Sequence, residues 1–130
     1  MNKKHNKDIA ELIKEGAEKI TDDNIQFLID NADEIKEKFS KDARLVIFAN
    51  DINPLFSLVA DYWEGEYREV PHAMIAAIVF TLLYVLEPLD RIPDFIPMIG
   101  YADDYDIMVK CFSMVELDLD RYKKWKLHYY

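Results

Sequence analysis

The chain has 130 residues, of which 51% are hydrophobic and 32% charged, and its formal net charge is −9. This length predicts a single domain, and the apolar fraction is large enough to build a core and to argue against general disorder. The acidic balance argues against a nucleic-acid partner, because such partners require clustered Lys and Arg. Cys111 is the single cysteine, which excludes an internal disulfide and argues against a cysteine-based zinc site.

The first half of the chain shows apolar residues at helical spacing. This pattern predicts a helix over about residues 7–19 and a second over about residues 22–39. Thr21 is a good N-cap for the second helix, and Asp22 and Asp23 suit its first turn, where carboxylates meet the positive end of the helix dipole. Lysines open the chain, but charged residues interrupt the apolar run that a signal peptide would need.

A third helix is expected through residues 45–49, with Ser40 or Asp42 as its cap. Asn53 and Pro54 should interrupt it, because the residue before proline avoids helical geometry. The same pair suits a new helix with Asn53 as N-cap and Pro54 at its first position, and Gly65 is a natural end for that helix.

Residues 73–86 contain no charged side chain and form the most apolar segment of the chain. A membrane-spanning helix needs about 20 apolar residues. The segment is shorter and has charges on both sides, so we expect a helix buried in the protein core. The alternative is a helix that dips into a membrane or an apolar partner.

A long final helix follows, with an apolar face that includes Ile107, Cys111, Val115 and Tyr122. No segment alternates with the period of two that marks a strand. The expected fold is therefore all-α, a compact bundle of about five or six helices with a Pro/Asp-rich loop between the last two. Cys111 should be a core thiol rather than a nucleophile.

Residues 84–104 combine prolines, aspartates and large apolar side chains in a pattern that resembles the signature of the DUF1232 (YkvA-like) family. The matching positions are Tyr84, Pro88, Asp90, Ile92, Pro93, Asp94, Ile96, Pro97, Gly100, Asp103 and Asp104. Similar flanking features extend the resemblance over about residues 55–126. We expect one domain over residues 1–130, with residues 1–53 as an N-terminal helical extension and residues 54–126 as the DUF1232-like core.

The resemblance implies a prokaryotic family of unknown biochemistry, many of whose members are expected to touch a membrane. It supplies no catalytic residue. Glu87, Arg91 and Asp106 depart from the usual pattern, and each adds a charge beside the apolar helix. These departures weaken the membrane interpretation for this chain. A cytoplasmic location, or one peripheral to a membrane, is therefore expected, and no cofactor is required.

The aspartates of this stretch allow a structural interpretation and a chemical one. Short carboxylates cap helices and stabilise turns, which is the simpler expectation. The alternative is a divalent-metal site for Mg²⁺, Mn²⁺ or Ca²⁺, which prefer oxygen ligands. Its candidate ligands are Asp90, Asp94, Asp103 and Asp104. A hydrolytic version, with the metal activating water, would also need a pocket and a base.

Five large apolar side chains in the same stretch suggest an interaction surface instead. They are Phe95, Ile96, Met98, Ile99 and Tyr101. Either they fill the core or they form a patch that contacts a partner, since exposed apolar patches usually mark interaction sites. Non-enzymatic interaction with an unidentified protein or a membrane surface is thus the leading hypothesis, and metal binding is the alternative. The sequence does not determine the oligomeric state.

Overall fold

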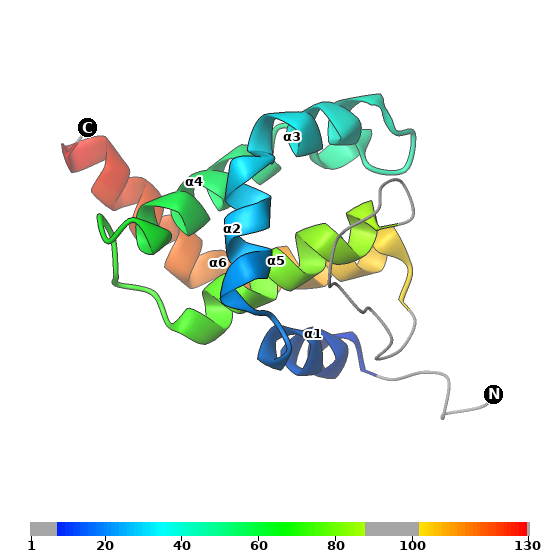
Figure 1. Cartoon of the computed structure of the whole chain (residues 1–130), viewed down its shortest axis with the longest axis horizontal. Helices are drawn as coiled ribbons and strands as arrows, with labels where there is room; N and C mark the ends of the chain where they lie inside the picture. Colours follow the sequence, from blue (N-terminus) through cyan, green and yellow to red (C-terminus); the bar gives the residue numbers. More distant parts are fainter. Residues whose placement is uncertain (1–7, 88–101, 130) are drawn as a thin grey trace.

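A computed structural model describes residues 8–87 and 102–129, and the described chain is all-helical. Figure 1 shows how the elements are arranged. The α-helices are α1 (Ile9–Glu18), α2 (Asp22–Asp30), α3 (Ala32–Lys41), α4 (Ile52–Trp63), α5 (His72–Leu86) and α6 (Asp104–Tyr129), with a short 3₁₀ helix η2 (Val46–Phe48) before α4. The predicted all-α bundle is confirmed.

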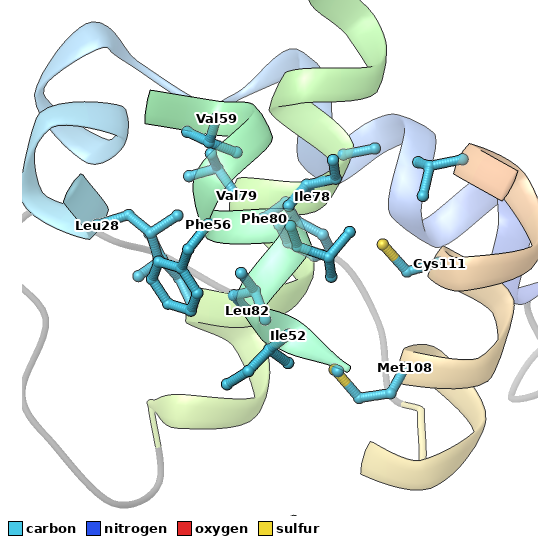
Figure 2. Packing of buried hydrophobic residues seen from close by; sticks show 14 of the residues in the cluster. Leu28, Ile52, Phe56, Val59, Ile78, Val79, Phe80, Leu82, Met108 and Cys111 are labelled. Carbon is cyan, nitrogen blue, oxygen red and sulfur yellow. The ribbon is translucent and has the colours of Figure 1, made fainter. Parts of the chain in front are cut away.

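Helix α5 is the central element of the core. Its side chains from residue 75 to residue 83 are all buried, and it contacts α1, α2, α4 and α6. Figure 2 shows Ile78, Phe80 and Leu82 of α5 between labelled side chains of α2, α4 and α6. The expected buried helix is therefore confirmed, because the chain itself covers the apolar surface of α5.

Helix α1 approaches α5 closely through a glycine. A Cβ atom on Gly16 would lie only 2.3 Å from the Phe80 ring, so only glycine fits there without movement of the ring. Leu12 and Ile13 of the same helix are fully buried. The first helix thus packs on the core, while the predicted division of the chain at residues 53 and 54 stays a prediction.

The predicted helix over residues 22–39 is wrong in one respect, because it breaks in two at Asn31. The Asn31 amide Nδ2 donates to the carbonyl of Phe27 at 2.9 Å, and the residue has φ −110° and ψ 20°. Asparagine competes with the helix for backbone groups in this way. Figure 1 shows that α3 turns away from α2 after the break. The predicted cap is confirmed, since Thr21 and Asn24 form a reciprocal capping box.

The segment before α4 also differs from expectation. No α-helix forms over residues 45–49, where the chain makes only η2, and Asp42 ends α3 instead of starting a helix. The Asp42 carboxylate accepts a hydrogen bond from the Arg44 backbone N–H at 2.8 Å, which favours a turn. The segment is too short for a stable helix before the next one begins.

Helix α4 starts at Ile52, with Asp51 rather than Asn53 as its N-cap. Pro54 is tolerated because backbone N–H groups in the first turn have no intrahelical partner to lose. The predicted end is confirmed: Gly65 follows the C-cap with φ +84°, a conformation that glycine adopts readily.

Candidate functional site: the two ends of helix α6

One candidate site lies where the chain enters α6, which we call the loop end. Tyr84, in the last turn of α5, accepts a hydrogen bond at its hydroxyl from the Ala102 N–H at 3.0 Å. The same hydroxyl lies 3.5 Å from the Ala102 carbonyl, to which it donates. Tyr84 therefore joins the end of α5 to the residue that precedes α6.

The first residues of α6 include two of the predicted metal ligands. The Asp103 carbonyl accepts the first helical hydrogen bond, from Ile107 N–H at 2.9 Å, so Asp103 starts the helix. Asp104 forms an ion pair with Arg44, whose Nε also lies 3.2 Å from Asp42 Oδ1. The predicted capping by these carboxylates stays a prediction, because the contact at Asp103 is made by its backbone carbonyl and the Asp104 carboxylate pairs with Arg44.

The other predicted site residues lie outside the described part of the chain. They are Asp90, Asp94, Phe95, Ile96, Met98, Ile99 and Tyr101. Within residues 8–87 and 102–129, no group of three His, Cys, Asp or Glu side chains is placed to hold a metal ion. Sequence reasoning did not identify Arg44, because its partner Asp104 lies 60 positions further along the chain.

The loop end also exposes an apolar surface, the loop-end patch, formed by Val46, Ile47, Tyr105 and Val109. Their exposed fractions are 49%, 65%, 50% and 44%, respectively. Phe48 is buried and holds η2 beside α6, with its ring centroid 5.6 Å from that of Tyr105 and 6.2 Å from that of Phe112. Two segments far apart in sequence therefore present apolar side chains together.

The opposite end of α6, which we call the basic end, differs in charge. Residues 104–120 carry five carboxylates and one lysine, whereas residues 121–129 carry four basic residues and no carboxylate. The basic residues are Arg121, Lys123, Lys124 and Lys126. Figure 1 shows this end of α6 at the far side of the molecule from residue 102.

A hydrogen-bonded group joins the basic end to α4. The Tyr122 hydroxyl donates to Asp61 Oδ2 at 2.5 Å and lies 2.5 Å from Ser57 Oγ. Lys126 Nζ lies 2.7 Å from the same Asp61 oxygen. These contacts fix the orientation of the last turns of α6 against α4.

Tyr122 and Lys126 do not have the properties of a catalytic base. Burial raises the pKa of Tyr122, and donation of its proton to Asp61 raises it further. The hydrogen bond to Asp61 also raises the pKa of Lys126, so the ammonium keeps its charge. A general base needs a pKa near the operating pH. Tyr122 therefore keeps its proton and Lys126 keeps its charge near neutral pH.

A groove of about 490 Å³ lies beside this group, between the first turns of α4 and the last turns of α6. Its lining residues are Asn53, Pro54, Ser57, Tyr122, Lys123, Lys126 and Leu127. The lining contains two lysines and no carboxylate. Leu127, at the rim, is 83% exposed.

Cys111 lies in the core between the two ends. Burial raises the pKa of its thiol to about 11, and the neighbouring Thr81 hydroxyl acts in the opposite direction. Figure 2 shows the sulfur directed toward the buried side chains of α5. The expected core thiol is confirmed, since a thiol with this pKa remains protonated near neutral pH.

Comparison with known proteins first shows similarity to one family over part of the chain. Residues 74–108 match the family described as "Protein of unknown function (DUF1232)". The matched segment runs from α5 through the Pro/Asp stretch into α6 and contains both Tyr84 and Ala102. The resemblance to this family is therefore confirmed over these residues.

The chain is also similar to a particular curated protein, "Uncharacterized membrane protein YkvA" of Bacillus subtilis (strain 168). The two are 29% identical over 76 residues, which cover 58% of this chain and 72% of the relative. No solved structure matches the chain. In the described ranges, no helix combines the length and the apolar character needed to cross a membrane.

Proposed function

We propose that the protein is a non-enzymatic helical interaction module at the cytoplasmic periphery of a membrane, with a contact surface for a protein partner at its loop end. The observation that carries this proposal is the loop-end patch. Four of the six large hydrophobic side chains exposed among the described residues belong to it, and they come from two packed segments. Contiguous exposed apolar surface of this kind usually marks an interaction site.

The Pro/Asp stretch contains further apolar side chains that we assign to the same surface. It follows α5 and leads into Ala102, which Tyr84 holds beside the start of α6. We propose that its large apolar residues enlarge the loop-end patch. These residues are Phe95, Ile96, Met98, Ile99 and Tyr101.

The charges around the patch indicate the chemistry of the partner. Asp103 and Asp106 are exposed beside Tyr105, and Asp104 is already paired with Arg44. A partner segment that is apolar with basic flanking residues would neutralise these carboxylates while it covers the patch. We therefore propose a protein segment of this kind as the occupant.

A peripheral membrane location has separate support. Helix α5 is covered by other helices of the same chain, so its apolar surface is occupied by protein. The similar protein of Bacillus subtilis is named a membrane protein. The basic end adds exposed cationic side chains, which favour contact with anionic lipid.

Site-specific photo-cross-linking of the full chain in its native cells tests the contact surface. A photoreactive residue replaces Ile47 in the patch or, as a matched control, Leu117, which is also exposed on α6 but lies outside the patch. We expect a discrete protein adduct from position 47 that position 117 does not give. Equal adducts at both positions, or none at position 47, would contradict the proposal.

A second variant tests whether the Pro/Asp stretch contributes to the loop-end patch. Phe95→Ser combined with Ile99→Ser should strongly reduce the adduct from position 47, with helical content by circular dichroism unchanged. Loss of the helical fold in this variant would show that the two side chains belong to the core.

The divalent-metal alternative, with Asp90, Asp94, Asp103 and Asp104 as ligands, stays a prediction. Arg44 already neutralises Asp104, so this carboxylate does not need a metal ion. The ion pair therefore favours the interaction surface over the metal site. Thermal unfolding of chelator-treated protein with and without Mg²⁺, Mn²⁺ or Ca²⁺ tests it. A rise of several degrees that Asp104→Asn abolishes would make metal binding the better account.

A further inference from the structure

We infer that the groove between α4 and α6 binds the headgroup of an anionic phospholipid and so attaches the basic end to a bilayer. This inference deepens the membrane part of the proposed function. It assigns a ligand class to a site far from the loop end, and it can be tested without knowing the protein partner.

Charge complementarity is the first argument. Lys123 and Lys126 line the groove, no carboxylate belongs to its lining, and Arg121 and Lys124 are exposed on the same last turns of α6. Lys126 is held in place by its contact with Asp61, so one ammonium is oriented before any ligand arrives. Asp61 offsets the charge of Lys126. An anionic group in the groove would therefore meet mainly the charge of Lys123 and those of the neighbouring Arg121 and Lys124.

The acidic charge of the loop end does not prevent this contact. Helix α6 has 26 residues. At 1.5 Å per residue its ends lie about 39 Å apart. Charges in physiological salt are screened over about 8 Å. Carboxylates at the loop end therefore have little influence on the basic end, whereas the lysines at the groove act directly on a surface in contact with it.

Apolar surface at the groove favours a lipid over free phosphate. Pro54 and Leu127 line it together with the Tyr122 ring, and Leu127 is 83% exposed. A bilayer surface offers phosphate groups next to apolar chains, and lysine stems can lie along apolar surface while their ammonium groups meet the phosphates. Inorganic phosphate would leave the apolar part of the groove uncovered.

A cluster of aromatic side chains supports the last turns of α6. Trp125 packs on Tyr67 and Tyr122, with ring centroids 5.0 Å and 5.9 Å away, respectively. Tyr67 and Tyr122 are buried, whereas Trp125 is partly exposed, and Trp is a residue enriched at membrane–water interfaces. The cluster gives the basic end a rigid support, so that attachment orders few additional side chains.

Vesicle co-sedimentation of the full chain tests the inference. Vesicles of phosphatidylcholine alone are compared with vesicles in which about a third of the lipid is phosphatidylglycerol. We expect binding to the anionic vesicles to be at least about tenfold tighter and to weaken as salt is raised. Equal binding to both compositions, or binding to neither, would overturn the inference.

A charge-reversing variant with a matched control locates the site. Lys123→Glu with Leu127→Ser alters the groove, and Lys41→Glu with Ile47→Ser makes the same types of change at or near the loop end. Each basic side chain contributes roughly fivefold to binding near an anionic surface. The groove variant should therefore lose at least about tenfold in affinity, while the control keeps wild-type affinity. An equal loss in both variants would overturn the inference.

Inorganic phosphate at millimolar concentration distinguishes a bilayer ligand from free phosphate. A bilayer site should retain most of its vesicle binding when ionic strength is held constant, whereas full release by phosphate would identify a free-anion site and overturn the lipid assignment. If the protein fails to bind vesicles but still forms the cross-link at position 47, only the lipid inference is contradicted. Loss of the cross-link with vesicle binding intact would remove only the loop-end partner.

Discussion

The two ends of α6 are each held by a tyrosine hydroxyl, but the tyrosines bind different partners. At the loop end, Tyr84 binds the backbone of Ala102, which precedes the helix. At the basic end, Tyr122 binds the side chains of Asp61 and Ser57 on a neighbouring helix. The first contact positions a segment of chain, whereas the second fixes one helix against another.

The two ends of α6 also differ in the charge that they expose. Arg44 at the loop end lies between Asp42 and Asp104, so its charge is largely neutralised by contacts within the protein. At the basic end Lys123 and Lys124 extend into solvent. The comparison shows how one long helix can present an apolar, acidic surface at one end and a cationic surface at the other.

Both ends depend on the core around α5, and the largest effect on stability is expected there. Gly16→Val places side-chain atoms where the Phe80 ring lies, because even a Cβ would be 2.3 Å from that ring. Overpacking of this kind costs about 3 kcal/mol. Urea unfolding should show the loss as a single transition that disturbs both ends together. Partial recovery in Gly16→Val with Phe80→Leu would confirm the contact, and a Gly16→Val protein of wild-type stability would contradict it.

High pH should destabilise the core next most strongly. The Cys111 pKa is raised from 9.0 to about 11, so the unfolded chain loses this proton before the folded chain does. The free energy of unfolding should therefore fall as pH rises from about 9 to about 11, by about 2 kcal/mol from this thiol. Cys111→Ala should show a smaller decrease over the same range, measured by urea unfolding at each pH. The same slope in both proteins would exclude this contribution.

Removing the Tyr122 hydroxyl should have a smaller effect, and one confined to the basic end. Tyr122→Phe removes a hydrogen bond to a carboxylate that is only 15% exposed, so we expect a loss of about 1–2 kcal/mol. Hydrogen exchange should speed up in the last turns of α6 and stay unchanged at Ile107. A uniform change along α6 would show that the two ends are not independent.

Tyr84→Phe is the equivalent change at the loop end and should cost about 1 kcal/mol or less, since its partner is a neutral backbone group. Exchange should increase at the start of α6, and anionic vesicle binding should be unchanged. The two variants should be compared by their losses in the free energy of unfolding. A larger loss in Tyr84→Phe than in Tyr122→Phe would contradict the assigned contacts.

Periodicity was sufficient to predict α1 and α6, and the uncharged apolar run of residues 73–86 predicted α5. Thr21 and Gly65 were predictable as helix boundaries for the same local reason. The break at Asn31 was not, because the apolar pattern of residues 22–39 continues across it. Whether asparagine bonds its own helix or points to solvent depends on where the next helix packs.

The candidate sites were less predictable than the fold. The partners Arg44 and Asp104 lie 60 positions apart, and Tyr122 and Asp61 lie 61 apart, so no local pattern connects them. The change of charge along α6 is visible in the sequence, but the groove exists only once α4 packs beside the last turns of α6. The family signature pointed to the loop end and the lysines near the end of the chain pointed to the basic end, whereas the groove was found only from the packing.

The orientation of the molecule on a bilayer tests the central contrast most directly. The buried, protonated Cys111 permits selective labelling of an introduced cysteine with an environment-sensitive fluorophore, at Ile47→Cys in the loop-end patch or at His128→Cys beside Leu127. Anionic vesicles should shift the emission of the label at position 128 to shorter wavelength and leave the label at position 47 unchanged. A shift at position 47 with none at position 128 would contradict the account.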